Sequence, residues 1–354
     1  CQRGCRLAEP GEFTRQAYLN KRLDFSQVEG VLDVIHAQSD RALSVARKRL
    51  TGECGKVIKG IVQDLTKIRA DVEAYIDFPE DELPPESKND CRQQLEHLID
   101  TLDRFRANAK NREFLQNGIQ AVIIGPPNAG KSSLLNALVG HNRALVSATA
   151  GTTRDYIGES LEIGGLLVHV YDTAGLNQLP SGDLEEAGIE HTRELIERAD
   201  FYLLVIDSSS ELPDMPDGIL EKLSSENCLV VENKTDLPDS EDRSSYLSDL
   251  PHVRISTFDR TSLKTLESKW QSLIEQKLDF QEDESMMFNV RQTEFIQRSL
   301  DELQEAHRVI NDTDATELVA FHLIRASEEL VKVNEQIDNE SVLDDLFQRF
   351  CIGK

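Results

Sequence analysis

The feature that most constrains this chain is a glycine-rich loop between an apolar run and a helical pattern. Residues 120–124 read Gln-Ala-Val-Ile-Ile, and the loop Gly125–Ser132 follows with the letters GPPNAGKS. This spacing fits a P-loop, in which backbone N–H groups surround phosphates while the lysine and the serine reach the outer phosphates and a magnesium ion. Apolar residues within 134–138 then repeat at helical spacing. The sequence therefore predicts a strand, a phosphate-binding loop and a helix in succession.

Two later motifs follow the P-loop in the order expected of a guanine-nucleotide site. Asp172-Thr-Ala-Gly175 comes after an apolar run, and its carboxylate can hold the Mg²⁺ shell while the Gly175 amide senses the γ-phosphate. Asn233-Lys-Thr-Asp236 follows another apolar run. The Asp236 carboxylate can accept two hydrogen bonds from guanine, whereas adenine offers no matching donors. The three motifs together predict GTP, and not ATP, as the ligand.

The segments between and after these motifs contain the candidate residues for GTP hydrolysis. Gly151-Thr-Thr-Arg-Asp155 lies where a switch loop supplies a threonine to Mg²⁺ and the γ-phosphate, and we assign that role to Thr153. Many small GTPases orient water with a glutamine after Asp-x-x-Gly, but this chain has Leu176 there. Glu185 and Glu190 are both candidates for that task, and the residue pattern alone does not choose between them.

The rest of the chain indicates the architecture. Short apolar runs at 166–171, 201–206 and 228–231 alternate with helical stretches, which favours a mostly parallel sheet covered by helices. Both flanks of this region carry apolar residues at helical spacing, and Ser26 with Glu29 fits a capping box that begins a helix. We therefore predict a multidomain protein with an α/β P-loop domain inserted into an all-α domain.

Composition excludes several classes of protein. The formal net charge of −25 argues against a general nucleic-acid coat, although a local basic site or a basic partner stays possible. The longest apolar run, 201–206, is far shorter than the roughly 20 residues that span a bilayer. The start lacks a signal peptide, so the expected location is the cytoplasm. Because the chain begins at Cys1 without methionine, we expect it to lack the true N-terminus of the protein.

Four features then give a close resemblance to a known family. They are Pro10–Thr14 with Ala17–Asn20, Ile76–Asp81, the P-loop with Gly151–Asp155, and the terminal Phe350–Lys354. The chain is similar to the MnmE (TrmE) family of bacterial tRNA-modification GTPases. The resemblance implies four segments: 1–20 as a remnant of a folate-binding domain, 21–117 and 279–354 as a helical domain, and 118–278 as the G domain.

The resemblance also implies an activity and partners. It implies a K⁺-activated GTP hydrolase that forms a homodimer and joins the flavoprotein MnmG in a heterotetramer. Together they would modify C5 of the wobble uridine of certain tRNAs with a carboxymethylaminomethyl or aminomethyl group. A tetrahydrofolate derivative would bind the folate domain, whose site is largely missing from this chain.

The resemblance also assigns residues to metal binding, nucleotide binding and catalysis. The Mg²⁺ ligands would be Ser132 and Thr153, the attacking water would be positioned by Glu185, and Cys351 would serve tRNA modification but not hydrolysis. The K⁺ ligands would be Asn128, Ser147, Thr149 and Thr152. The nucleotide set would comprise Asn128, Ala129, Gly130, Lys131, Ser132, Ser133, Ser147, Thr149, Thr152, Thr153, Asp172, Thr173, Ala174, Gly175, Asn233, Lys234, Asp236, Ser256 and Thr257.

Some residues depart from the pattern or allow other interpretations. Gln16 stands where the family usually has arginine, and Ser256-Thr-Phe258 stands where it usually has Ser-Ala-Lys. Asn128 also fits an ordinary turn residue, and Cys351 also fits a frayed tail or a poor prenylation box. A rival function is a ribosome-assembly GTPase switch without a covalent product, which should carry a basic RNA-binding appendage. A scaffold with a dead nucleotide site is disfavoured because Lys131 and Asp236 are both present.

Overall fold

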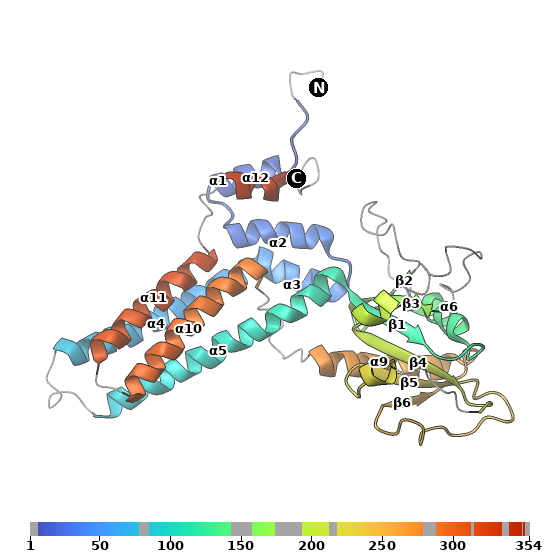
Figure 1. The fold of residues 1–354 in the computed structure, drawn as a ribbon. Coiled ribbons are helices and arrows are strands. Elements are labelled where there is room, and N and C mark those ends of the chain that lie inside the picture. The colour runs from blue at the N-terminus through green and yellow to red at the C-terminus, as the bar shows by residue number, and fades with distance from the viewer. Residues whose placement is uncertain are drawn as a thin grey trace. The chain divides into compact units, whose positions relative to one another are not determined.

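The chain folds into two compact units, each described here by itself. The structure, a computed structural model, describes residues 6–77, 85–142, 158–173, 193–211, 218–278, 288–312, 315–334, 340–348 and 350. The helical unit comprises residues 1–37, 42–113 and 282–354, and the α/β unit comprises residues 38–41 and 114–281 (Figure 1). The α/β unit is therefore inserted in the chain between two parts of a helical unit, as the sequence predicts.

The helical unit is built from long helices before and after the insertion. They are α1 (Glu12–Leu19), α2 (Phe25–His36), α3 (Asp40–Leu50), α4 (Glu53–Asp77), α5 (Pro85–Asn117), α10 (Val290–Asp312), α11 (Thr316–Asn334) and α12 (Glu340–Gln348). The helical run that the sequence pattern extends through residues 26–50 is interrupted between α2 and α3. Within the described part of the chain, no helix has the length and the apolar character that a membrane crossing requires.

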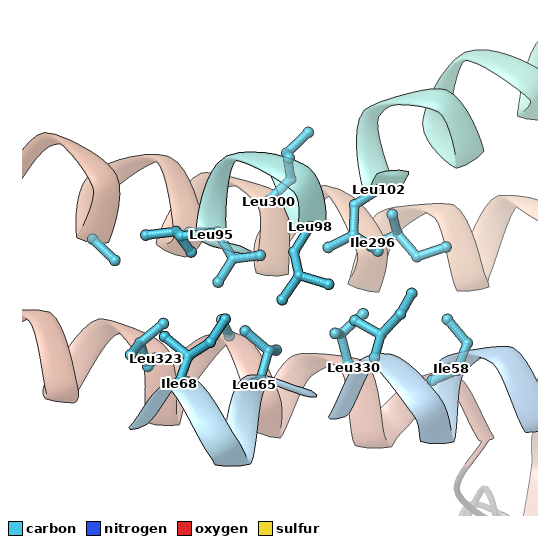
Figure 2. Close-up of a cluster of buried hydrophobic side chains, with 14 of the residues drawn as sticks. Ile58, Leu65, Ile68, Leu95, Leu98, Leu102, Ile296, Leu300, Leu323 and Leu330 are labelled. Carbon is cyan, nitrogen blue, oxygen red and sulfur yellow. The ribbon is translucent and has the colours of Figure 1, made fainter. Parts of the chain in front are cut away.

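The main core of this unit joins α4 and α5 to α10 and α11. In α4, buried residues recur three and four positions apart, which places them on one face of the helix. They are Ile58, Ile61, Leu65, Ile68 and Val72. They meet Leu95, Leu98 and Leu102 of α5 and buried residues of α10 and α11 such as Leu300 and Leu330 (Figure 2). Both chain segments that flank the insertion are therefore needed to complete one apolar core.

A second apolar cluster brings the two ends of the described chain together. Tyr18 of α1 and Phe25 of α2 pack in one buried cluster with Leu343 and Phe347 of α12 and with Phe350. These segments lie more than three hundred positions apart in the sequence. Their contact holds the beginning and the end of the helical unit side by side, as Figure 1 shows for α1 and α12.

The capping box expected at Ser26 and Glu29 is wrong. The N-cap of α2 is Asp24, whose carboxylate accepts from the backbone N–H of Gln27 at 2.8 Å, while the Gln27 side chain accepts from the Asp24 N–H at 3.0 Å. The helix thus begins two residues earlier than the pattern suggests. Ser26 and Glu29 are used elsewhere, because both lie on the buried side of α2 and face polar partners from remote helices.

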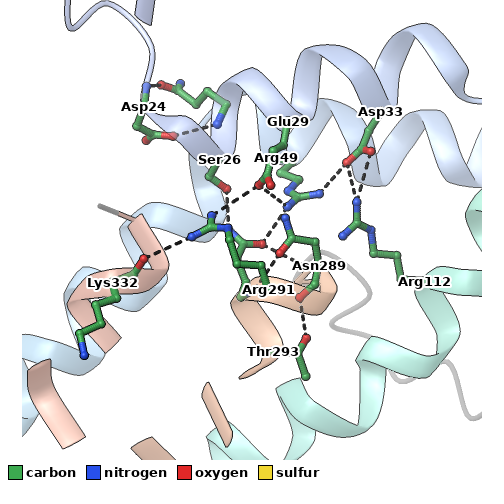
Figure 3. Close-up of polar contacts among 12 residues, drawn as sticks. Asp24, Ser26, Glu29, Asp33, Arg49, Arg112, Asn289, Arg291, Thr293 and Lys332 are labelled. Atoms are coloured by element: carbon green, nitrogen blue, oxygen red, sulfur yellow. Dashed lines mark hydrogen bonds and ion pairs between the residues drawn. The ribbon is translucent and has the colours of Figure 1, made fainter. Parts of the chain in front are cut away.

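Those partners form a buried polar network around Arg49 (Figure 3). The Arg49 guanidinium, only 2% exposed, donates to Asp33 at 2.6 Å, to Glu29 at 3.0 Å and to the Gln292 amide oxygen at 2.8 Å. The Gln292 amide in turn donates to the Ser26 hydroxyl at 3.0 Å. The network therefore ties α2 and α3, which precede the insertion, to α10, which follows it.

Burial sets the electrostatics of this network. Burial raises the pKa of Glu29, although attraction to Arg49 and other arginines opposes the rise. Burial, together with repulsion from Arg49, lowers the pKa of Arg112 to about 10, and Asp33 offsets part of this by pairing with Arg112 at 3.3 Å. Charges withdrawn from water are tolerable only when they are paired and hydrogen-bonded. Within the described residues the network pairs each of these charges, although the Nε–H of Arg49 has no hydrogen-bond partner.

The α/β unit is a mostly parallel sheet, as the sequence predicts. Its strands are β1 (Ile119–Ile124), β2 (Gly158–Ile163), β3 (Leu166–Asp172), β4 (Phe201–Asp207), β5 (Cys228–Asn233) and β6 (His252–Arg254). The order is β2-β3-β1-β4-β5-β6, with only β2 antiparallel to its neighbour. The strands β2 and β6 were not expected from the apolar runs. The unit also contains α6 (Lys131–Asn142), the short 3₁₀ helix η2 (Leu220–Lys222) and α9 (Arg260–Leu278).

The apolar strands of the sheet set the position of the loops that carry the motifs. Strands β1, β4 and β5 are almost entirely buried, and alternate residues of all three, such as Val122, Leu204 and Val230, share one cluster. Ligands of open parallel sheets bind beyond the carboxyl ends of the strands. In this unit β1 ends at the P-loop, β3 at Asp172 and β5 at Asn233, so all three motifs lie at that edge.

Candidate nucleotide-binding site

The P-loop follows β1 and has a backbone that only glycine fits at two positions. Gly125 has a φ of 142°, and a Cβ there would lie 2.1 Å from the carbonyl oxygen of Val205. Gly130 has a φ of 97°, and a Cβ there would lie 2.3 Å from the side-chain nitrogen of Asn233. The two glycines let the loop run close to β4 and β5, which turns its backbone around the space in front of α6.

Lys131 begins α6 and folds its side chain over the loop. It is only 6% exposed, and its ammonium donates to the carbonyl oxygens of Gly125 and Pro126, both at 2.8 Å. Burial lowers the pKa of Lys131, and attraction to Asp172 partly offsets the shift. Both hydrogen-bond partners are neutral carbonyls, and the ammonium forms no ion pair within the part of the chain that the structure describes. A phosphate group would supply a directly hydrogen-bonded counter-charge at this position.

Ser132 and Asp172 bring two oxygen ligands together beside Lys131. The Ser132 hydroxyl donates to a carboxylate oxygen of Asp172, which ends β3 and is 8% exposed. The register Ile123↔Asp172 places this carboxylate next to the end of β1. Hard oxygen donors of this kind suit Mg²⁺, so the residues present fit the ion that a P-loop implies. The next residue, Thr173, uses its hydroxyl differently, donating to the carbonyl of Ile123 at 3.0 Å.

Asn233 joins the phosphate side of the site to the base side. It ends β5 and is 1% exposed, and its amide nitrogen donates to the carbonyl oxygen of Ala129 in the P-loop at 2.9 Å. The two residues are 104 positions apart in the sequence. The phosphate-binding loop and the Asn233–Asp236 motif are therefore parts of one site.

The segment after Asn233 presents Asp236 to solvent beside a second loop. Asp236 is exposed, so its carboxylate is accessible for the base contact that the sequence predicts. The backbone N–H of Thr235 donates to the carbonyl of Ile255 at 3.1 Å, which ties this segment to the loop that holds Ser256 and Thr257. Ser256 is 5% exposed and Thr257 is half-buried, so the loop is anchored on its Ser256 side.

Comparisons with known proteins agree with this organisation. The family model described as the MnmE helical domain matches residues 25–351. The tRNA modification GTPase MnmE of Opitutus terrae is 39% identical over 360 residues, which cover 99% of this chain and 78% of that protein. The proteins of the same name from Lactococcus lactis subsp. lactis and Aquifex aeolicus are each 35% identical over 353 residues, covering 99% of this chain and 77% and 78% of theirs.

The chain belongs to the MnmE family. One solved structure, the G domain of the T. maritima FeoB iron transporter, is similar over 44% of this chain and 98% of that chain. Its sequence identity is 24% and its TM-score is 0.31, values that carry no argument for the fold. The MnmE assignment rests on the family model and on the relatives that match nearly the whole chain.

Several residues that the MnmE resemblance assigns to the site lie outside the described residues. They are Ser147, Thr149, Thr152, Thr153, Ala174, Gly175, Glu185 and Cys351, and the alternative acid Glu190 lies outside them as well. Among the described ones, Asn128 is exposed in the middle of the P-loop with a φ of 63°. Ser132 and Ser133 are exposed at the start of α6.

Two carboxylates at the carboxyl-end edge of the sheet were not among the residues predicted from the sequence. Asp207 ends β4 and pairs with Lys234, the residue after Asn233, at 2.6 Å. Glu232 precedes Asn233, is 1% exposed, and accepts from the backbone N–H of Arg243 at 2.9 Å and from His252 at 3.0 Å. The available signal was an acid at or near the carboxyl end of an apolar run, a position that faces the ligand in parallel sheets.

Proposed function

We propose that this chain is a GTP hydrolase of tRNA modification that K⁺ activates. The observation that carries the proposal is the hydrogen bond from Asn233 to Ala129, because it joins a phosphate loop and a guanine-selective motif in one site. Membership of the MnmE family adds the biological context, since the named relatives are tRNA modification GTPases. The acidic net charge of −25 suits an enzyme whose partner supplies much of the basic tRNA surface.

The residues of the site divide the work of binding GTP. Lys131 and the P-loop amides, with Ser133 and Thr173 beside them, would bind the phosphates, and Asp236 would accept the ring N–H and the amine of guanine. Ser256 and Thr257 would line the base. Ser132 and Asp172 would hold Mg²⁺ directly or through water, with Thr153 completing the set. When bound, this ion withdraws charge from the phosphates and so favours cleavage.

Potassium activation would depend on the exposed amide of Asn128. Its left-handed backbone and its exposure leave the side-chain oxygen open to a cation beside the phosphates. Ser147, Thr149 and Thr152 would complete that ligand set, and Ala174 and Gly175 would follow the γ-phosphate. Glu185 would orient the attacking water, in place of the glutamine that this chain lacks.

The proposal extends to partners and to the domains of the chain. We assign residues 118–278 to the G domain, 21–117 and 279–354 to the helical domain, and 1–20 to the end of a folate-binding domain. The active form would be a homodimer that joins MnmG and acts on the wobble uridine of tRNA in the cytoplasm, with Cys351 needed for modification. A tetrahydrofolate derivative would require residues beyond those of this chain.

GTP turnover in matched KCl and NaCl buffers, with ATP as the control, tests the proposal first. We expect faster turnover in KCl and none with ATP, and we expect Glu185→Ala to bind GTP while losing most turnover. Equal turnover of GTP and ATP would contradict the assignment of the base site. Slow turnover that is equal in both salts, together with no uridine modification in the presence of MnmG, would favour the ribosome-assembly switch.

A further inference from the structure

Asp207 is a carboxylate at the nucleotide site without an assigned role in nucleotide binding. It ends β4, and the register Asp207↔Asn233 places it beside the end of β5. Its two oxygens have separate partners. One accepts from the Ser209 backbone N–H at 2.9 Å and from the Ser209 hydroxyl at 2.6 Å, and the other accepts from the Lys234 ammonium at 2.6 Å. Ser209 thus fixes the carboxylate in an orientation that leaves one oxygen for Lys234.

The Asp207–Lys234 pair is well sheltered at the edge of the sheet. The Asp207 side chain is 14% exposed and the Lys234 side chain 31% exposed. Burial alone would raise the pKa of Asp207, but the hydrogen bonds from Lys234 and Ser209 outweigh it, and the pKa is lowered. The carboxylate therefore stays charged, and a partly buried pair with this geometry is stronger than an exposed one.

The position of Lys234 in the chain links the Asp207–Lys234 pair to Asp236. The backbone of Lys234 is left-handed, with a φ of 64°, and its ammonium is bound to Asp207. Both ends of the aliphatic stem are therefore fixed in position. Asp236 lies two residues further on and is exposed. Within the described parts of the chain, Asp236 forms no hydrogen bond and no ion pair. Glu232 and Asp236 each lie two positions from Lys234, but Glu232 is 1% exposed and already accepts from Arg243 and His252. A released Lys234 ammonium would therefore find its available carboxylate in Asp236.

We propose that Asp207 is a positioning residue that keeps the Lys234 ammonium away from Asp236 and holds the lysine stem as a wall of the base site. The inference rests on the proposed GTP-binding function. Asp236 can accept the two guanine donors only while its oxygens are free of a competing cation. Fixing the lysine in advance also avoids the loss of its rotamer freedom when the nucleotide binds. Asp207 would thus set guanine preference without touching the base.

The test compares Asp207→Asn with wild type by nucleotide affinity and kinetics. Because a charge-assisted bond is lost and Asp236 becomes occupied, we expect GDP affinity to fall about tenfold. Inosine diphosphate, which lacks the exocyclic amine, should lose less, so the preference for GDP over inosine diphosphate should shrink. KM for GTP should rise with kcat unchanged, since the reacting phosphate lies at the other end of the nucleotide.

A double-mutant cycle shows whether Asp207 acts through Lys234. Lys234→Met keeps an apolar stem and removes the ammonium, so adding Asp207→Asn to it should cause little further loss of GDP affinity. Asp239→Asn is the matched control, because Asp239 is an exposed carboxylate in the same segment after β5, and it should leave affinity unchanged. The tryptophan fluorescence of Trp270, the only tryptophan of the chain, shows that each variant is folded.

The outcomes separate the inference from the function on which it rests. Wild-type protein that binds no guanine nucleotide would overturn the proposed function, and with it this inference. Wild-type binding with an unaffected Asp207→Asn variant would overturn the inference alone. Equal losses for both nucleotides, or losses that add fully to those of Lys234→Met, would also overturn it, because they would show a general structural role.

Discussion

Each of the two units buries a cation, and the two cations are treated in opposite ways. In the helical unit, Arg49 is 2% exposed and donates to the carboxylates of Asp33 and Glu29 and to the amide of Gln292. In the α/β unit, Lys131 is 6% exposed and donates to two neutral carbonyls of its own loop. Arg49 is hydrogen-bonded to two carboxylates, whereas Lys131 feels the attraction of Asp172 but forms no ion pair with any carboxylate among the described residues.

The difference teaches how to separate a structural charge from a functional one. A buried charge is costly in free energy unless it is paired. Its counter-charge therefore comes either from another residue of the fold or from a bound ligand. The pKa of Lys131 is lowered by burial, which records the cost that an incoming phosphate would remove. Burial by itself does not distinguish the two cases, but the chemistry of the partners does.

The largest expected effect comes from removing the structural cation. Arg49→Met should lower the free energy of unfolding of the helical unit by about 3–5 kcal/mol, because Glu29 and Asp33 stay buried without their main partner. Urea unfolding followed by far-UV circular dichroism reports chiefly the helices. Trp270, buried in α9, reports the α/β unit by fluorescence and should show an unchanged midpoint.

Arg47→Met is the matched control for this variant. Arg47 lies on the same helix but is exposed, so its loss should change stability by less than about 0.5 kcal/mol. Nucleotide affinity should be unchanged in both variants while they are folded. An Arg49→Met protein as stable as wild type would break the comparison on its structural side.

The second effect, slightly smaller, comes from removing Lys131, the cation that we propose binds phosphate. Lys131→Met should weaken GDP binding by about 100-fold, since a charge-assisted bond to phosphate is lost. It should not lower the urea midpoint seen by Trp270 fluorescence, because the variant removes a buried charge whose desolvation outweighs its attraction to Asp172. The exposed Lys222→Met serves as the control. Loss of stability equal to that of Arg49→Met would mean that Lys131 is a structural charge after all.

The smallest effect is a pH dependence confined to the α/β unit. Burial lowers the pKa of His169 on β3, against a hydrogen bond with the backbone of Asn117 that raises it. The unfolded chain therefore takes up a proton at higher pH than the folded unit. Stability is then lost as pH falls from about 6.5 through the lowered folded pKa, below which no further loss follows from this group.

His169→Gln should flatten this dependence while keeping a hydrogen-bond donor. The measurement is the urea midpoint of Trp270 fluorescence at about pH 8 and at about pH 5.5, on either side of the ordinary histidine pKa. His141→Gln, an exposed histidine on α6, should keep the wild-type slope. An unchanged slope in His169→Gln would assign the acid sensitivity to other groups.

Much of the fold and part of the site could be predicted from the sequence. The glycines at 125 and 130, the apolar strands before each motif and the helical spacing of the flanks act over a few residues, so they can be recognised without the fold. The capping box at Ser26 and Glu29 shows the limit of such reasoning. Asp24 and Gln27 satisfy the same local rule two residues earlier, and only the remote partners of Ser26 and Glu29 decide between them.

The order of the motifs, the strand–loop–helix unit and the chemistry that each motif can perform follow from the amino-acid sequence alone. These depend on backbone sterics and on donors and acceptors within short stretches. The pairing of remote polar groups depends on the folded chain: Gln292 meets Arg49 across 243 positions, Asn233 meets Ala129 across 104, and Lys234 meets Asp207 across 27. The physical reason is that a charge is stabilised by what lies near it after burial, and the chain order does not specify those neighbours.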